Sequence, residues 1–194
     1  AGGASSRLGA CKALVDLAGA TPLARLLAAG CDLSGAPALV IAGADHAAIA
    51  AAAPAGVEVA QNEGWRAGRT GSVQLAARLR PGLALCLAPV DVPRVPREVF
   101  RTLLDAWLAA GEPGRGWFAP RTAGLPARHG HPVMLGAELL ELAHSLAPDE
   151  PLRTLRERAR PLGSVPVSGR EVLESLDTPA DLERLRFLAR SAPG

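Results

Sequence analysis

The first twelve residues, A-G-G-A-S-S-R-L-G-A-C-K, combine the features that an anion-binding loop needs. Gly2, Gly3 and Gly9 permit backbone conformations and close approaches that other residues do not. Such a loop can turn successive N–H groups toward an anion. Its polar side chains are Ser5, Ser6, Arg7 and Lys12. The spacing is neither a P-loop nor G-x-G-x-x-G. The alternative interpretation is a plain glycine- and serine-rich turn that carries two solvated cations.

Lys12 is the only lysine of the chain, and the other 20 of its 21 lysine and arginine residues are arginines. A lysine retained in such a background suggests a position where a compact ammonium is needed and a planar guanidinium does not fit. Chance is the alternative, since a stray lysine would be unremarkable. Together with Arg7, this side chain supplies the positive charge that a triphosphate requires.

Asp91 follows the apolar run 83–88, within the segment L-A-P-V-D-V-P. An acidic residue just past the carboxyl end of a strand lies where open α/β sheets bind ligands. A carboxylate there can hold Mg²⁺, which bridges phosphate oxygens and usually takes only one or two protein carboxylates. Asp91 is therefore a candidate magnesium ligand. The alternative is an aspartate that caps a helix beginning near Pro96.

Residues 62–73, N-E-G-W-R-A-G-R-T-G-S-V, form a further candidate nucleotide contact. Asn62, at the end of a predicted strand, has an amide suited to reading a base edge. The loop from Gly68 to Ser72 leads into a helix whose N-terminus favours anions. On the structural alternative, Trp65 is a packing residue and the glycines belong to an ordinary loop.

The segment L-D-T-P-A-D-L, residues 176–182, has a good structural interpretation. Thr178 is a helix cap, Pro179 the first helical residue, and Asp181 completes a start that resembles a capping box. Asp177 is a second, weaker candidate for the magnesium site. Two histidines, His129 and His131, lack the cysteine partners or the spacing that zinc requires.

Apolar runs and helical patterns alternate along the chain. β-rich runs lie at 37–43, 57–61, 83–88, 116–120, 131–135 and 164–168. Helical patterns lie at 22–30, 46–53, 71–80, 96–110, 137–146, 151–159 and 179–190. This alternation predicts an α/β fold with a mostly parallel sheet that helices cover on both faces. Thr21 and Asp45 are the expected caps of the first two helices.

The 194 residues fit one domain, 1–194, with no internal repeat and no dividing linker. The run 83–88 lacks polar alternation, which predicts a central strand buried on both faces. A glycine-rich loop that opens an α/β domain normally follows a strand. We therefore expect an apolar strand of about five residues upstream of Ala1. The segments 111–116 and 121–130 are the most loop-like, and each is positioned to flank a site.

Composition excludes several classes of protein. A net charge of +2 is too small to indicate a nucleic-acid or membrane partner. No apolar run reaches the roughly 18 residues of a membrane span. The three cysteines lack C-x-x-C spacing, which favours a reducing cytoplasm without disulfides or structural zinc.

Residues 1–12 resemble the L-A-G-G-x-S-x-R-M-G-x-x-K signature of the MobA/MocA-like nucleotidyltransferases, which are molybdenum cofactor guanylyl- and cytidylyltransferases. Leu8 stands in place of the family's Met. The four later segments, around Asn62, Asp91, His131 and Asp177, resemble further family elements in the family's order. The resemblance therefore covers essentially the whole chain. Gly71 and Ser175 depart from it, since the family has a serine and an acid or amide there.

The resemblance implies a three-layer α/β/α, Rossmann-like (GT-A-like) fold and roles for individual residues. Arg7, Lys12 and Asp91 are its expected catalytic residues, with Mg²⁺ on Asp91 and Asp177. His131 and Pro132 are expected to border the acceptor pocket. The expected nucleotide-binding residues are Ala1, Gly2, Gly3, Ser5, Ser6, Arg7, Lys12, Asn62, Gly68 and Ser72.

The implied activity is Mg²⁺-dependent transfer of a nucleotide from CTP or GTP to a molybdopterin-type acceptor, with release of pyrophosphate. A molybdoenzyme is a candidate partner. The opening Ala1-Gly2-Gly3 resembles guanylyltransferases, whereas the segments at Asn62 and Gly130 resemble cytidylyltransferases, so CTP is slightly favoured. Two alternatives remain: a sugar- or polyol-phosphate nucleotidyltransferase of the same fold, and a catalytically silent chaperone that binds the cofactor.

Overall fold

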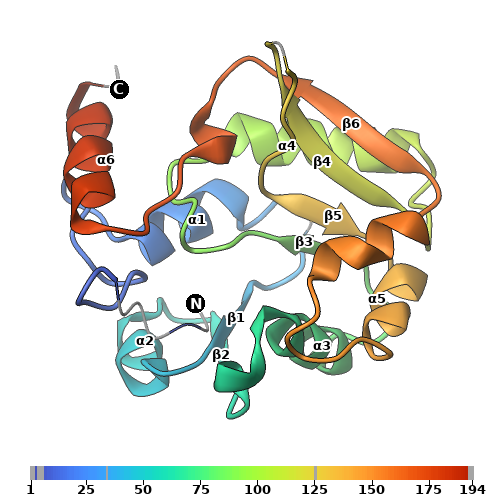
Figure 1. Cartoon of the computed structure of the whole chain (residues 1–194), viewed down its shortest axis with the longest axis horizontal. Coiled ribbons are helices and arrows are strands. Elements are labelled where there is room, and N and C mark those ends of the chain that lie inside the picture. The colour runs from blue at the N-terminus through green and yellow to red at the C-terminus, as the bar shows by residue number, and fades with distance from the viewer. Residues whose placement is uncertain (1–2, 4–6, 34, 125, 192–194) are drawn as a thin grey trace.

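The computed structural model describes residues 3, 7–33, 35–124 and 126–191 (Figure 1). Its α-helices are α1 (Pro22–Gly30), α2 (His46–Ala52), α3 (Arg69–Leu79), α4 (Arg97–Ala109), α5 (Ala137–Ala143) and α6 (Pro179–Ser191). Its 3₁₀ helices are η1 (Trp65–Ala67), η2 (Leu152–Glu157) and η3 (Glu171–Leu173). Its strands are β1 (Leu39–Ala42), β2 (Glu58–Gln61), β3 (Leu85–Leu87), β4 (Trp117–Thr122), β5 (Val133–Leu135) and β6 (Leu162–Val167).

The strands form a pair, β1–β2, and a four-stranded sheet in the order β3-β5-β4-β6. The pairs β1–β2 and β4–β6 are parallel, as predicted. The strand β5 runs antiparallel to both of its neighbours, β3 and β4. The sheet is therefore mixed rather than mostly parallel. The reason lies in the connection, because β4 reaches β5 through a loop, and parallel strands need a longer crossover.

Helices cover both faces of the four-stranded sheet (Figure 1). One face presents Trp117, Val133 and Leu135 to a core that includes Leu139 and Leu140 of α5. The opposite face presents alternate residues of the same strands, and these pack against α4 in a core of Leu103, Trp107, Phe118, Met134 and Val165. Burial on both faces follows from the period of two along each strand. The predicted α/β architecture with helices on both faces is confirmed.

Local signals fixed several helix starts. The Thr21 hydroxyl accepts a hydrogen bond from the Ala24 N–H at 3.1 Å, and Pro22 is the first residue of α1. Thr178 and Asp181 form a reciprocal pair at the start of α6. The Asp181 N–H donates to the Thr178 hydroxyl at 3.2 Å, and the Thr178 N–H donates to the Asp181 carboxylate at 2.9 Å. Asp45 precedes α2 but makes no capping bond with its side chain.

Two predicted elements need correction. Within the helix predicted at 151–159, residues Leu152–Glu157 form the 3₁₀ helix η2 rather than an α-helix. The run 83–88 was predicted as a central strand buried on both faces. Among the described strands, however, β3 pairs with β5 alone and lies at the edge of its sheet. Leu85 and Leu87 are half-buried against the α5 core, while Cys86 is exposed. A purely apolar sequence does not distinguish an edge strand from a central one.

Candidate active site

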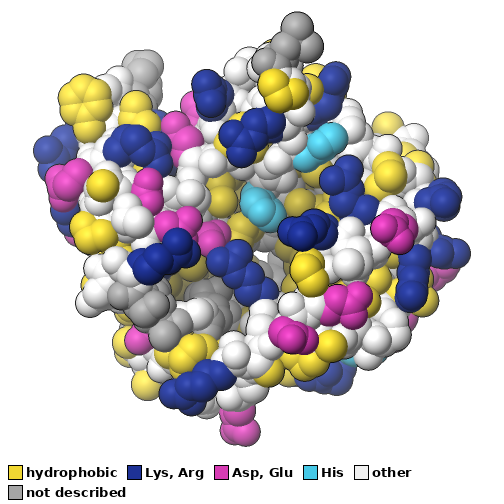
Figure 2. Space-filling model, in the orientation of Figure 1, with side chains coloured by type: hydrophobic (Ala, Val, Ile, Leu, Met, Phe, Trp, Pro, Cys, Tyr) yellow, Lys and Arg dark blue, Asp and Glu magenta, His cyan; other side chains and the backbone are white. Residues whose placement is uncertain are grey.

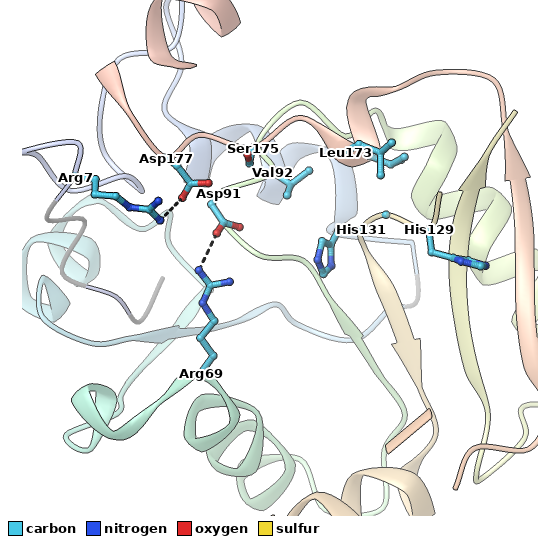
Figure 3. Close-up of a pocket in the computed structure, with 11 residues that line it drawn as sticks. Arg7, Arg69, Asp91, Val92, His129, His131, Leu173, Ser175 and Asp177 are labelled. Carbon is cyan, nitrogen blue, oxygen red and sulfur yellow. Dashed lines mark hydrogen bonds and ion pairs between the residues drawn. The ribbon is translucent and has the colours of Figure 1, made fainter. Parts of the chain in front are cut away.

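An open pocket of about 270 Å³ collects most of the charged residues that the sequence singled out. Figure 3 shows its side chains converging from the N-terminal segment, the end of β3, the start of α3, the β4–β5 loop and the segment before α6. Its described lining residues are Arg7, Arg69, Asp91, Val92, His129, Gly130, His131, Val172, Leu173, Ser175 and Asp177.

Backbone hydrogen bonds hold three remote segments of this pocket together. The Leu176 N–H donates to the Asp91 carbonyl at 2.7 Å, which brings the segment before α6 beside the end of β3. The His131 N–H donates to the Val172 carbonyl at 3.0 Å. Both bonds join residues far apart in the chain. The C-terminal segment therefore positions Asp177 and His131 relative to Asp91.

The carboxylate of Asp177 is held by two cations of the N-terminal segment. The Lys12 Nζ lies 2.6 Å from Asp177 Oδ1, and the Arg7 guanidinium lies 3.3 Å from the same oxygen. The side chain of Lys12 is only 14% exposed, whereas that of Arg7 is 70% exposed. The hydrogen bond from Lys12 holds the pKa of the Asp177 carboxyl below its ordinary value, although partial burial acts in the opposite direction. Asp177 is therefore ionised at neutral pH.

Asp91 lies across the pocket from the first residue of α3. The guanidinium of Arg69 is 3.5 Å from Asp91 Oδ2. Arg69 is 88% exposed and Asp91 only 18%, so the arginine reaches in from solvent toward a fixed carboxylate (Figure 3). An exposed ion pair of this kind contributes little to stability. A ligand can therefore displace Arg69 easily.

His131 lines the same pocket, to one side of the Asp91–Arg69 ion pair (Figure 3). The residue as a whole is exposed. Burial lowers the pKa of His131; Asp91 acts against this effect, and Arg69 adds to it. The imidazole is mainly neutral at pH 7, when it can donate one hydrogen bond and accept another.

The structure brings together four of the predicted site residues: Arg7, Asp91, His131 and Asp177 line one pocket, and Lys12 joins them through Asp177. Pro132, next to His131, is buried and does not line the pocket. Gly3 is exposed. The predicted contacts Ala1, Gly2, Ser5 and Ser6 lie outside the described residues.

The predicted contacts on the 62–73 segment lie outside the pocket lining. The Asn62 amide donates to the Ser72 hydroxyl at 3.0 Å, and Asn62 is buried. Gly68 has a φ of 145°, and a side chain there would meet the backbone of Pro148. This glycine therefore has a packing reason of its own.

Sequence reasoning missed Arg69, and it named His129 only in setting a zinc site aside. Arg69 is one of 20 arginines, and nothing in its immediate sequence separates it from the others. Its place beside Asp91 depends on how α3 packs against the end of β3. The position of Arg69 at a helix N-terminus that follows a glycine was the one available signal.

The pocket offers hard oxygen donors to a divalent ion. Among the described residues, no group of three or more His, Cys, Asp or Glu side chains is gathered for metal binding. Two aspartates, Asp91 and Asp177, nevertheless line the same pocket. Mg²⁺ and similar ions commonly take only one or two carboxylates, and substrate phosphates and water complete the shell. The donor set therefore fits a metal that arrives with a nucleotide.

Residues 1–162 match the model of the MobA-like NTP transferase domain. The chain belongs to this family. The match spans the N-terminal segment, Asp91 and His131, and it confirms the resemblance inferred from the motifs. Membership supports nucleotidyltransferase activity. No curated protein sequence matches the chain significantly.

Solved structures agree with the family. The chain is 25% identical to Rv0371c from Mycobacterium tuberculosis H37Rv, covering 96% of this chain and 93% of that one, with a TM-score of 0.77. The chain is 24% identical to a complex of Rv0371c with manganese, covering 93% of this chain and 92% of that one, with a TM-score of 0.70. It is 17% identical to molybdopterin-guanine dinucleotide biosynthesis protein A from Archaeoglobus fulgidus, covering 98% of this chain and 96% of that one, with a TM-score of 0.73. The Rossmann-like nucleotidyltransferase fold is thereby confirmed.

Within the described part of the chain, no helix is both long enough and apolar enough to cross a membrane.

Proposed function

We propose that this MobA-like protein transfers a nucleoside monophosphate from a nucleoside triphosphate to a phosphorylated acceptor, with release of pyrophosphate. The observation that carries the proposal is the meeting of Arg7, Lys12, Asp91 and Asp177 around one pocket. Cations suit the phosphates of the nucleotide, and carboxylates suit a divalent ion bound to those phosphates.

In the proposed reaction, a phosphate oxygen of the acceptor forms a bond to the α-phosphorus. The bond from the α-phosphorus to the bridging oxygen breaks, and its electron pair leaves with pyrophosphate. The attacking oxygen is already anionic, so the reaction needs no strong base. Catalysis then rests on positioning and on neutralising negative charge. The neutral imidazole of His131 serves to orient the acceptor by hydrogen bonding.

Lys12 and Arg7 are the residues that would neutralise the triphosphate. Asp177 forms an ion pair with each of them. Binding of the nucleotide would draw the two cations from the carboxylate to the phosphates. Asp91 and Asp177 would hold Mg²⁺, which when bound offsets charge on the phosphoryl oxygens. The manganese complex of Rv0371c supports a divalent ion in this fold.

We favour CTP over GTP by a small margin, and a molybdopterin-type compound as the acceptor. The resemblance of two separate segments, at Asn62 and at Gly130, to cytidylyltransferases supports CTP. The opening Ala1-Gly2-Gly3 supports GTP. The similarity of the fold to a molybdopterin-guanine dinucleotide biosynthesis protein supports the acceptor. By the same argument, the expected partners are the nucleotide, the acceptor and a molybdoenzyme that receives the product in the cytoplasm.

The test is a binding titration followed by an assay. CTP and GTP are titrated with Mg²⁺ or Mn²⁺, and pyrophosphate release is then measured with molybdopterin or with a panel of sugar and polyol phosphates. We expect release with molybdopterin and faster turnover with CTP. Release with sugar or polyol phosphates alone would move the proposal to that class. Tight binding of molybdopterin without any release would favour a silent chaperone, an alternative that Gly71 and Ser175 keep open.

A further inference from the structure

A second group of polar and cationic side chains adjoins the candidate active site on the side of β4 and the edge strand β6. His129 lines the pocket, but its ring points away from Asp91, toward β4 and β6 (Figure 3). The imidazole Nε2 lies 2.7 Å from the Ser164 hydroxyl. None of the roles proposed above uses His129, Ser164 or the arginines around them.

The register of the sheet brings these residues to one face. Ser164 of β6 pairs with Ala119 of β4, and His129 pairs with Arg121 through an isolated antiparallel bridge. Residues 119 and 121 point to the same face of β4, because side chains alternate along a strand. The small Ala119 side chain leaves the room that the His129 ring needs to cross β4 and reach Ser164.

A second arginine reaches the same face from η2. The Arg156 guanidinium lies 6.0 Å from the centroid of the Trp117 ring, and Trp117 precedes Ala119 on this face of β4. Arg156 therefore stands over the sheet beside His129. Figure 2 shows dark blue side chains next to a histidine over this part of the molecule. Arg121 is exposed and Arg156 is half-buried.

Two guanidinium groups close to one imidazole concentrate positive charge, which a bound anion would offset. Burial lowers the pKa of His129, and the charges of Arg156 and Arg121 lower it further. The two guanidinium charges disfavour protonation of the ring, which therefore stays neutral. Guanidinium groups, an imidazole N–H and a hydroxyl are together suited to bind a phosphate-type oxyanion.

We propose that Arg121, His129, Arg156 and Ser164 form an oxyanion subsite that holds an anionic group of the acceptor remote from its attacking phosphate. Of the four residues His129 lines the pocket, so the subsite adjoins the site of Asp91 on the side of β4 and β6. This inference rests on the proposed function for the identity of the ligand. The presence of the subsite itself can be tested without any activity.

The first test measures the His129 pKa by NMR titration of the imidazole signals, assigned with a His129→Gln variant. Inorganic phosphate is the probe. An oxyanion bound beside His129 stabilises the imidazolium, so phosphate should raise its pKa by about half a unit or more. His144, an exposed residue at the C-terminal end of α5 and outside the pocket lining, serves as an internal reference. A His129 pKa that saturating phosphate leaves unchanged would overturn the subsite.

Variants then test which side chains bind the anion. Arg121→Ala with Arg156→Gln should raise the His129 pKa in the absence of phosphate, because two repelling charges are gone, and should abolish the response to phosphate. Arg156→Gln removes the charge over Trp117 but retains most of the aliphatic side chain, which limits any effect on packing. Arg153→Ala is the matched control, since Arg153 is an exposed residue of the same 3₁₀ helix. A full phosphate response in the double variant would contradict the assignment.

Kinetics decide whether the anion belongs to the acceptor or is a free phosphate. In the double variant the KM of the acceptor should rise about tenfold, while the KM of the nucleotide and kcat change by less than about twofold. A phosphate response of His129 with an unchanged acceptor KM would overturn the assignment to the acceptor. If the protein has no transferase activity but His129 still responds to phosphate, the proposed function fails and the subsite stands.

Discussion

The Lys12 ammonium lies 2.6 Å from the Asp177 carboxylate, although 165 positions separate the two residues in the chain. The contact joins the N-terminal segment to the residue that precedes the capping box of α6. It keeps the candidate phosphate-binding lysine and a candidate metal-binding carboxylate in one place before any ligand arrives. A bound triphosphate and divalent ion would replace this ion pair by two others: Lys12 with a phosphate, and Asp177 with the metal ion.

Replacing Lys12 by alanine should reduce turnover by at least about 100-fold, with the fold intact. The reason is that an ammonium aimed at developing phosphate charge typically contributes about 3–4 kcal/mol to lowering the barrier. Turnover is measured as pyrophosphate release, and the fold is checked by circular dichroism. Arg101→Ala serves as the control, because Arg101 is an exposed cation on α4 that is outside the pocket lining. Near-normal turnover in Lys12→Ala would discredit the site.

Asp91→Ala should reduce turnover to a similar extent, at least about 100-fold. Asp91 is the candidate metal ligand at the end of β3, so the variant should also bind Mn²⁺ more weakly in the presence of nucleotide. Binding is followed by calorimetry, which does not depend on turnover. Asp105→Asn, an exposed aspartate of α4, is the matched control. Unchanged Mn²⁺ binding by Asp91→Ala would remove Asp91 from the metal site.

Some of these relationships follow from sequence and others do not. The position of Asp91 was predictable, because an apolar run that ends in a polar residue marks the end of a strand. The capping of α6 was predictable from Thr178, Pro179 and Asp181 alone. These signals are local and depend on backbone geometry within a few residues.

The rest depends on packing between distant elements. Arg69 reaches Asp91 only because α3 packs beside the end of β3, and a sequence with 20 arginines gives no reason to choose this one. The edge position of β3 depends on which strands pair, which an apolar run does not encode. Lys12 pairs with Asp177 across 165 positions, and the neighbouring Leu176 to Asp91 hydrogen bond joins backbone groups, which carry no residue signature.

The stability of the protein should depend on pH through Asp177. Its carboxyl has a lower pKa in the folded state than in the unfolded state, chiefly because Lys12 donates a hydrogen bond to it. The stabilisation is therefore present above the unfolded pKa, at about pH 4, and is lost as the pH falls through the folded pKa. Urea unfolding of the wild type and of Asp177→Asn should differ at pH 7 and converge in acid. A difference that persists at low pH would assign the effect to packing instead of charge.

Thr178→Ala should lower the free energy of unfolding by about 1 kcal/mol, because it removes the hydroxyl that accepts the Asp181 N–H at the start of α6. Asp181→Asn should have a smaller effect, since an amide oxygen still accepts from the Thr178 N–H. Both are measured by urea denaturation at neutral pH. Equal losses in the two variants would indicate that the charge of Asp181 matters as much as the Thr178 hydroxyl.

Two glycines of the 62–73 segment should respond to alanine in opposite ways. Gly68 has a φ of 145°, and an added Cβ would meet the backbone of Pro148 and Asp149. Because backbone cannot move aside cheaply, Gly68→Ala should destabilise the protein by about 2 kcal/mol. Gly71 lies inside α3, where an added Cβ would make only ordinary contacts, at 3.7 Å from Asn62 Nδ2 and 3.8 Å from Pro148 Cβ.

Gly71→Ala should therefore leave stability unchanged or raise it by up to about 1 kcal/mol, the difference in helix propensity between the two residues. Thermal and urea unfolding of both variants give the comparison, with each variant as the control for the other. If Gly68→Ala were as stable as the wild type, the close approach of this loop to Pro148 would be wrong. The N-terminal turn of α3, where Arg69 faces Asp91, would then have a different position.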